Sequence, residues 1–472
     1  MKRAISLILV ALMMVLAVPA FSVAAAETAQ SDVVVYLNGT AGADANDGKT
    51  AATAVATIAT AVQLVNEHAD AKSAVIVICG ATSFGDEFHN VIPDSTAVIT
   101  LTSSYGGVDY RNDGAKIVSP NKNVSVTYFN GEYVFDCVHY ETINTNAIIC
   151  MQYNNLTVTE NFTNAPIAAN EGITTHYPIL LLGYNGTGTM DKAAGNPTFS
   201  GETNVAINGG TWQYLRGGDR DSSTTFDGTL TINVNGGKFL AGNGGATTYF
   251  DGANMNSPTG KGNYGDHAKI VVNLNGGELA GFIGSCYLKS GNVSFADITV
   301  NINNGVKIAD YFCAVQQKDA MFAGKLTINV NGGDLSGLTE SKLADLTAAN
   351  GGVGVVTVNH DPDNAASAAA FKALKDVCVE DNGVTYGTIK VEATTEPVVT
   401  TEAVVTTEAV VTTEATVDTT VAVVDTTAAV VDTTAATGEV TPPTGDASLM
   451  FVFAAAAVLC AAAVVIIKKR EN

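Results

Sequence analysis

Residues 216–221, RGGDRD, concentrate the side chains best suited to chemistry in this chain, because arginine is scarce elsewhere. They closely follow Trp212 and Tyr214. Aromatic rings can stack on sugar rings, and guanidinium and carboxylate groups can hold hydroxyls or uronates. These residue types in this order predict a site for a sugar polymer.

A second polar segment, residues 247–267, stands at nearly the same place after the next glycine pair, and we expect the two segments to meet. The predicted ligand-binding residues are Trp212, Tyr214, Arg216, Tyr249, Tyr264 and His267. Asp251 is expected beside them. The alternative is that both segments are ordinary solvated loops, with Trp212 in the core.

Catalysis would need carboxylates about 5 to 9 Å apart in a glycoside hydrolase. The set that could supply them is Asp219, Arg220, Asp221 and Asp266. No motif of such an enzyme is present, so we predict no catalytic residues beyond these candidates.

Residues 44–48, DANDG, could hold calcium, but their spacing misses the helix-loop-helix pattern. We expect an Asx turn there, and no metal site or cofactor.

A repeat must position these side chains. The heptapeptide TINVNGG ends at Gly237 and again at Gly333, and related segments end at Gly210, Gly277 and Gly305. The steps are 27, 40, 28 and 28 residues, which places an insertion within residues 247–267. A unit of this length with one alternating strand and no helical period predicts a solenoid, in which each turn of chain, or rung, stacks on its neighbours.

Alternation of apolar and polar residues assigns the faces of each strand. The residues expected to point inward are Ile232, Val234, Val272, Leu274, Val300, Ile302, Ile328 and Val330, and those expected outside are Asn233, Asn273, Asn301 and Asn329. A column of hydrogen-bonded amides is expected at the corner, from Asn208, Asn235, Asn275, Asn303 and Asn331, in a left-handed conformation that asparagine tolerates. A large residue then refills the core at Trp212, Phe239, Leu279 and Leu335, while the rung containing Lys307 departs from the pattern.

The repeat resembles the right-handed parallel β-helix, the all-β fold of pectate lyases and many surface adhesins. The resemblance covers about residues 33–391 of an ectodomain that spans residues 27–393. It goes with strands expected at residues 75–79, 97–103, 133–138 and 154–159. An N-terminal capping helix using Val55, Ile58, Val62 and Val65, starting near Thr53 or Thr57, should cover one end. A helix and a hairpin turning at Asp381, Asn382 and Gly383 should cover the other.

The two ends of the chain indicate export. Residues 1–26 have a basic start, a short apolar run and small residues, as in a cleaved signal peptide. Residues 394–440 are rich in Thr, Val and Ala with single acids and no Lys or Arg, which predicts a disordered spacer. Residues 448–467 form an apolar run long enough for a transmembrane helix, followed by a basic tail.

Residues 441–472 resemble the cell-wall sorting signal of Gram-positive surface proteins, whose motif is Leu-Pro-x-Thr-Gly. The corresponding residues are Thr441, Pro442, Pro443, Thr444 and Gly445. Pro442, Thr444 and Gly445 match the motif, Pro443 stands at its variable position, and Thr441 replaces the leucine. The resemblance implies that a sortase cuts after Thr444 and joins it to peptidoglycan. A plain single-pass membrane anchor is the alternative.

The cysteines and the charge narrow the functions further. No cysteines have the spacing of a metal site, and Cys286 and Cys313, one rung apart, could stack but are expected to be free thiols. The net charge of −22 makes nucleic acid an unfavourable partner. We therefore expect a wall-anchored, adhesin-like or glycan-binding surface protein without catalysis. The alternative is an extracellular polysaccharide lyase or glycoside hydrolase on the same scaffold.

Overall fold

The computed structural model describes residues 33–85, 89–119, 124–142, 146–166, 177–185, 198–218, 225–240, 250–251, 267–284, 293–294, 297–314, 321–322, 324–345 and 354–391. The chain divides into two units, residues 1–395 and 396–472. The second unit, the predicted signal peptide and the predicted sorting signal lie outside the described residues. No helix in the described ranges is long and apolar enough to cross a bilayer.

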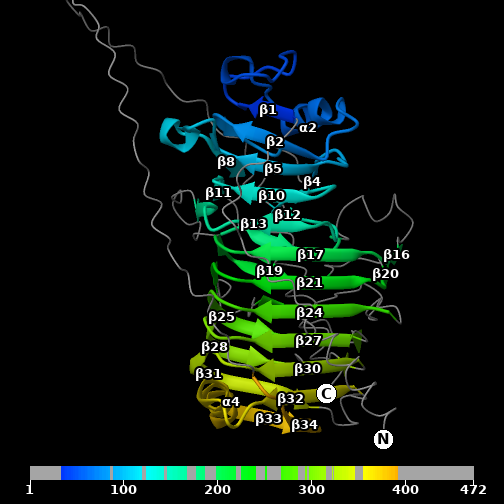
Figure 1. The fold of residues 1–472 in the computed structure, drawn as a ribbon, viewed down its shortest axis with the longest axis vertical. Helices are drawn as coiled ribbons and strands as arrows, with labels where there is room; N and C mark the ends of the chain where they lie inside the picture. The colour runs from blue at the N-terminus through cyan, green and yellow to red at the C-terminus, as the bar shows by residue number, and fades with distance from the viewer. Residues whose placement is uncertain are drawn as a thin grey trace, which may run out of the picture. The chain divides into compact units, whose positions relative to one another are not determined.

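Parallel strands stack into long sheets in the first unit (Figure 1). The first sheet collects one strand from every rung. Its strands in spatial order are β1 (Val33–Leu37), β2 (Ser73–Ile78), β5 (Val98–Thr102), β10 (Tyr133–Asp136), β13 (Leu156–Val158), β17 (Glu202–Ile207), β21 (Thr229–Val234), β24 (Lys269–Leu274), β27 (Asp297–Ile302), β30 (Lys325–Val330), β32 (Val355–His360) and β34 (Val384–Thr388).

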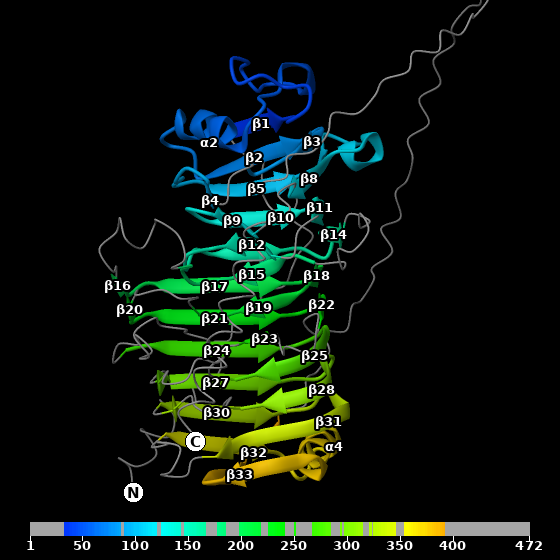
Figure 2. The same ribbon diagram turned by 180° about the vertical axis from the view of Figure 1, so that it is seen from behind.

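A second sheet and a four-stranded sheet complete the rungs, as the reverse view shows (Figure 2). The second sheet contains β4 (His89–Val91), β9 (Val124–Tyr128), β12 (Asn146–Cys150), β15 (Ile179–Leu181), β19 (Tyr214–Arg216), β23 (Phe250–Asp251), β25 (Glu278–Ile283), β28 (Lys307–Cys313), β31 (Asp334–Asp345) and β33 (Cys378–Asn382), with β18 (Thr211–Trp212) and β22 (Lys238–Phe239) joined to its edge. The third contains β3 (Ala81–Thr82), β8 (Lys116–Ser119), β11 (His139–Thr142) and β14 (Thr163–Pro166).

Short two-stranded pairs lie beside these sheets. They are β6 (Ser104–Tyr105) with β7 (Val108–Asp109), β16 (Thr198–Phe199) with β20 (Thr225–Phe226), and β26 (Val293–Ser294) with β29 (Met321–Phe322). Among the described strands only β6 and β7 pair antiparallel. Long parallel sheets built from successive rungs fit a β-helix solenoid, as the repeat predicts. The four strands predicted before residue 160 are confirmed as β2, β5, β10 and β13.

The predicted inward residues of the repeat are confirmed. Each is at most 1% exposed: Ile232, Val234, Val272, Leu274, Val300, Ile302, Ile328 and Val330. They pack in register from rung to rung, for example with Val300 beside Val272 and Ile328. The rung with Lys307 keeps the pattern after one extra residue, since Val306 is inserted and Ile308 takes the place opposite Leu279.

The predicted amide column is confirmed, and it has a twin. Four corner amides each donate from Nδ2 to Oδ1 of the asparagine in the preceding rung at 2.7 or 2.8 Å: Asn235, Asn275, Asn303 and Asn331. Asn208 accepts the first of these bonds. A second column on the outer face joins Asn233, Asn273, Asn301, Asn329 and Asn359 in the same way. These columns tie rungs together outside the core, in addition to the backbone ladder.

The left-handed residue of each corner is the second glycine and not the asparagine, which corrects our expectation. Gly237 has φ 87°, and no asparagine of the column has a positive φ. A Cβ on Gly237 would lie 2.8 Å from the carbonyl oxygen of Gly209 in the preceding rung. Glycine is therefore required both by the backbone conformation and by the close approach of the neighbouring rung.

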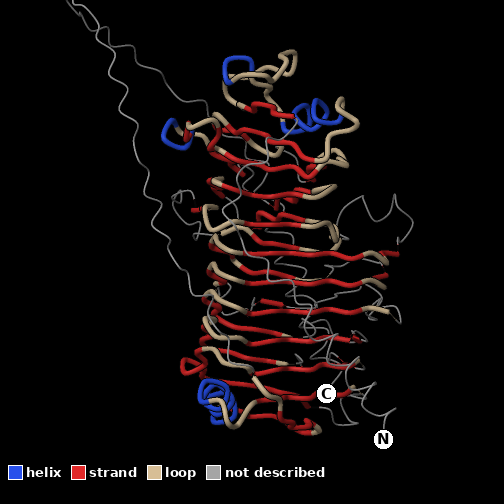
Figure 3. The backbone as a smooth tube through the Cα atoms, in the orientation of Figure 1, coloured by secondary structure: helices blue, strands red, loops and turns tan. Residues whose placement is uncertain are grey.

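Helices lie at the two ends of the stack (Figure 3). At the N-terminal end, the 3-10 helix η1 (Ala51–Thr53) precedes α2 (Ile58–Asn66), which begins after Thr57 as N-cap. The predicted lid residues Val55, Ile58, Val62 and Val65 are all buried, so the N-terminal lid is confirmed. Another 3-10 helix, η2 (Tyr110–Asp113), follows β7.

At the C-terminal end, α4 (Ala365–Asp376) begins after Asn364 and packs on β31, which confirms the predicted helix. The predicted hairpin at Asp381–Gly383 is wrong. β33 pairs with β31 and β34 pairs with β32, both parallel, so the two strands belong to different sheets. Gly383, with φ 81°, makes a corner of the coil like the glycine of the other rungs.

Candidate functional site

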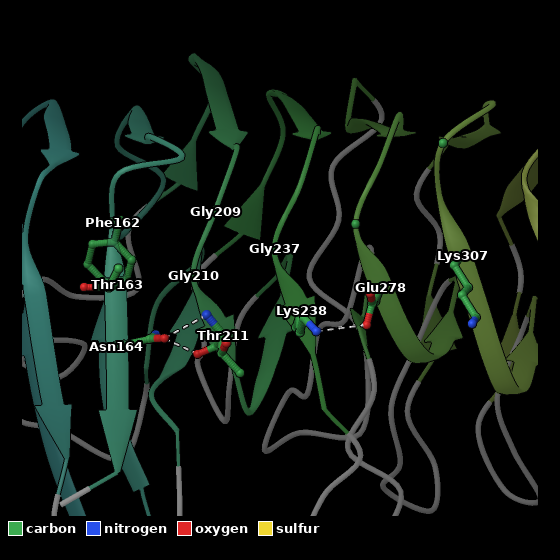
Figure 4. Close-up of a pocket in the computed structure, with 12 residues that line it drawn as sticks. Phe162, Thr163, Asn164, Gly209, Gly210, Thr211, Gly237, Lys238, Glu278 and Lys307 are labelled. Atoms are coloured by element: carbon green, nitrogen blue, oxygen red, sulfur yellow. Dashed lines mark hydrogen bonds and ion pairs between the residues drawn. The ribbon is translucent and has the colours of Figure 1, made fainter.

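A groove of about 610 Å³ runs across the glycine corners of successive rungs. Its lining residues come from the loops and strands that follow the amide column: Phe162, Thr163, Asn164, Gly209, Gly210, Thr211, Gly237, Lys238, Gly277, Glu278, Gly305 and Lys307. The close-up labels Gly209, Gly210 and Gly237 at adjacent corners and shows Lys238, Glu278 and Lys307 on successive rungs (Figure 4). The corner carbonyls are used between rungs, since Gly210, Gly237 and Gly277 accept from the backbone N–H groups of Lys238, Glu278 and Lys307. The side chains that follow the corners are therefore the groups available to a ligand.

The charged residue that follows each glycine corner faces outward. From rung to rung, these residues alternate in the sign of their charge. The register places Lys238 beside Glu278, Glu278 beside Lys307, and Lys307 beside Asp334. Lys238 Nζ lies 3.3 Å from Glu278 Oε2, with the side chains 58% and 62% exposed. Such an exposed pair contributes at most about 1 kcal/mol to stability, so its charges remain available to a ligand at little cost.

Asp334 at the C-terminal end of the row is held ionised. The Ser336 hydroxyl donates to Asp334 Oδ1 at 2.6 Å, and the Ser336 backbone N–H donates to the same oxygen. These two hydrogen bonds, with a smaller contribution from Lys307, lower the pKa of Asp334. The row thus places lysine and carboxylate side chains in alternation along four rungs.

At the other end of the groove, Asn164 joins two rungs through its side chain. Its Nδ2 donates to the Thr211 carbonyl at 2.6 Å, and its Oδ1 accepts from the Thr211 N–H at 2.8 Å (Figure 4). The Asn164 side chain thus links β14 to β18 through two hydrogen bonds, as a pair of backbone groups would do in a regular ladder.

Trp212 lies beneath the groove and not on its surface. The indole is fully buried, stacks on Phe162 with ring centroids 5.4 Å apart, and donates from Nε1 to the Gly209 carbonyl at 3.0 Å. The structure therefore favours the core alternative for this residue: Trp212 supports the groove floor and cannot stack on a ligand from outside.

Tyr214 and Arg216 come together on β19, but both are buried, at 8% and 4% exposure. The guanidinium lies over the Tyr214 ring, 5.5 Å from its centroid. Tyr214 packs with a second apolar cluster on the outer side of the second sheet, formed with Val126, Tyr128, Ile148, Cys150, Ile179 and Leu181. Backbone register places Asp251 opposite Arg216, as the predicted meeting of the two segments requires.

His267 lies at a different corner, where it contacts Asp227. The imidazole Nδ1 is 3.1 Å from Asp227 Oδ2, and the His267 backbone N–H donates to Asp227 Oδ1. These hydrogen bonds, the backbone one first, lower the pKa of Asp227. The other predicted site residues lie outside the described residues: Asp219, Arg220, Asp221, Tyr249, Tyr264 and Asp266.

The acidic loop at residues 44–48 has a structural use. Asp44 Oδ1 accepts from the backbone N–H groups of Ala56 and Thr57, and Oδ2 accepts from the Thr57 hydroxyl. The carboxylate thus fixes the segment that leads into α2. Within the described ranges, no three His, Cys, Asp or Glu side chains converge as a metal site would require.

Cys79, Cys137 and Cys378 form no disulfide. Cys286 lies outside the described residues, so the expectation that it and Cys313 are free thiols stays a prediction.

Sequence reasoning missed the charged row, although its signal is present. Lys238, Glu278 and Asp334 each stand directly after a glycine pair, and Lys307 follows after the one inserted residue. The alternation of sign at one register position was the signal that could have found the groove. The chain matches no family model, no curated protein and no solved structure, so no family is assigned to it.

Proposed function

We propose that this protein is an exported surface protein whose coil binds a polymeric glycan in the groove without cleaving it. The groove carries this proposal, because it repeats the same backbone corner and alternates Lys238, Glu278 and Lys307 on successive rungs. A polymer of repeated sugar units offers hydroxyls that both donate and accept hydrogen bonds, so it can bind lysine and carboxylate side chains along one line.

The number of carboxylates in the groove favours binding over cleavage. Glycoside hydrolysis uses a pair of carboxyl groups, and Glu278 is the one acidic residue among the described residues that line the groove. The enzymatic alternative depends on the aspartates at 219, 221 and 266, outside the described residues.

We also propose that the coil is right-handed and wall-anchored. Connections between parallel strands of one sheet are right-handed in about 98% of cases. The order of motif, apolar run and basic tail in residues 441–472 supports sorting by a sortase, and residues 1–26 support export. In a Gram-positive host, Thr444→Ala should shift the full-length protein from the peptidoglycan fraction to the membrane fraction.

The binding role is tested with the full-length chain in detergent on immobilised polysaccharides of plant, host and bacterial origin. The groove variant combines Lys238→Ala, Glu278→Ala and Lys307→Ala. The chain supplies a matched control on the first sheet, where Lys269, Asp297 and Lys325 form the same sequence of charges on three adjacent rungs. The corresponding triple alanine variant removes equal charge away from the groove.

We expect retention on at least one polysaccharide, about a tenfold or greater loss of affinity in the groove variant, and no loss in the control. Equal effects of the two variants would refute the groove as the binding surface. Release of shortened or unsaturated sugars by the unmodified protein would refute the non-catalytic role.

A further inference from the structure

We propose that Asn382–Gly383 is a site of spontaneous deamidation, and that the amide column protects the other corner Asn–Gly pairs from the same reaction. The reaction joins the Gly383 backbone nitrogen to Cγ of Asn382 and breaks the Cγ–Nδ2 bond, so ammonia leaves with the amide proton. Solvent water then opens the cyclic imide at either carbonyl, which gives aspartate or isoaspartate.

The corner pairs that begin at Asn235, Asn275 and Asn331 are constrained at both reacting groups. In the pair Asn275–Gly276, Nδ2 donates to Asn235 at 2.8 Å and Oδ1 accepts from Asn303 at 2.7 Å. The nucleophile is also engaged, because the Gly276 N–H donates to the Val234 carbonyl at 3.0 Å. Attack would break these hydrogen bonds and rotate a residue whose strand is paired on both sides.

Asn382–Gly383 has none of these constraints. Among the described residues, neither the Asn382 side chain nor the Gly383 N–H has a hydrogen-bond partner, and both residues are exposed. β33, which ends at Asn382, is the terminal strand of the second sheet and pairs with β31 alone. An end strand opens locally at lower cost than an internal one, so the glycine nitrogen can reach Cγ.

Exposure alone does not separate the two cases, because Asn235 and Asn275 are exposed as well. Two other Asn–Gly pairs are constrained in different ways. Asn130 donates to the Ile92 carbonyl at 2.9 Å. Asn304 has no hydrogen-bond partner among the described residues, but its amide lies against Gly332 of the next rung, where an added Cβ would lie 2.0 Å from Asn304 Oδ1. The free Asn382 amide therefore differs from the others in its contacts.

Conversion would act on the C-terminal lid. The neighbouring Asp381 accepts hydrogen bonds from Lys375 Nζ at 2.5 Å and from the Tyr386 hydroxyl at 2.7 Å, which fasten α4 to β33 and β34. Isoaspartate at position 382 lengthens the backbone by one carbon next to Asp381, which shifts the Asp381 carboxylate relative to Lys375 and Tyr386. Ageing of the protein outside the cell would thus loosen this end of the coil first.

The test is prolonged incubation of the full-length protein in warm, mildly alkaline buffer, followed by peptide mapping that resolves asparagine, aspartate and isoaspartate. The Asn235, Asn275 and Asn331 peptides of the same molecule are internal controls, and a urea-unfolded sample shows the rates without structure. Asn382→Gln, which cyclises slowly, keeps the amide and serves as the matched variant.

We expect Asn382 to convert about tenfold or more faster than Asn275 in the folded protein, with the difference lost in urea. Hydrogen exchange in β33 and β34 should rise with the converted fraction and stay constant in the Asn382→Gln variant. Equal rates at Asn382 and Asn275 in the folded protein, or an unchanged Asn382 peptide, would overturn the proposal.

Discussion

Replacing Asn303 with alanine tests whether the amide column stabilises the coil. Asn303 is internal to the column: its Nδ2 donates to Asn275 Oδ1 at 2.7 Å, and its Oδ1 accepts from Asn331 Nδ2 at 2.8 Å. A net contribution of about 0.5–1.5 kcal/mol for each hydrogen bond predicts a loss of about 1–3 kcal/mol in the free energy of unfolding.

Asn331 supplies the matched control, because it is the last member of the column and makes one of these bonds. Both side chains are half-buried, and both substitutions remove the same atoms. Asn331→Ala should therefore cost about half as much as Asn303→Ala, or about 0.5–1.5 kcal/mol. In a solenoid each rung contacts only its neighbours, so the two substitutions affect the same few rungs and their costs can be compared directly.

Urea unfolding of the full-length chain measures both losses. Trp212 is the single tryptophan of the chain and is fully buried, so its fluorescence reports loss of the core. A cost for Asn331→Ala equal to or greater than that for Asn303→Ala would refute the additive column. Two unchanged midpoints would show that water replaces the amide partners without loss.

Three further predictions address the corners, the core and the C-terminal lid. Gly237→Ala should lower the free energy of unfolding by more than Gly106→Ala. Both glycines have positive φ, so both substitutions carry a backbone strain of about 1–3 kcal/mol, but a Cβ on Gly106 would have nothing within 4 Å. Urea midpoints measure the difference between the two variants. Trp212→Ala should lower the free energy of unfolding by about 3–5 kcal/mol, because it empties a core position. Trp212→Phe should leave glycan retention unchanged. Loss of retention in a stable Trp212→Phe protein would support the predicted role of Trp212 as a ligand-binding residue. Hydrogen bonds from Lys375 and Tyr386 lower the pKa of Asp381 below 3.8, so its stabilising contribution is complete above that pH and is lost as pH falls through the folded value. Asp381→Asn should remove this part of the acid dependence of the thermal midpoint, and an identical pH profile for the variant would contradict the assignment.

The fold was largely predictable because the repeat determines it at many positions at once. A register error of one residue would bury Asn273 and Asn301 and expose Val272 and Val300, so alternation alone fixes the faces of each strand. The corner column followed from the same alignment. The hairpin at Gly383 was mispredicted because a turn glycine between two short strands has the same local sequence in a hairpin and in a coil corner.

The site was less predictable, because residue type does not reveal burial. Trp212 and Arg216 have the side chains expected of a sugar-binding surface, yet the coil places the first in its core and buries the second against the Tyr214 ring. The groove instead uses Lys238 and Glu278, ordinary surface residues whose significance depends on their neighbours one rung away. Such a surface is visible once the register between distant segments is known.

Cross-linking of register partners tests the stacked coil most directly. Thr299 and Thr327 are partners on adjacent strands β27 and β30, and Thr357 follows on β32. Neighbouring strands lie about 4.8 Å apart, within disulfide reach, whereas strands two rungs apart do not. In the oxidised full-length protein, mass spectrometry should find a disulfide in Thr299→Cys/Thr327→Cys and in Thr327→Cys/Thr357→Cys, and none in Thr299→Cys/Thr357→Cys. A disulfide in the third pair without one in the first two would contradict the parallel stacking on which the groove depends.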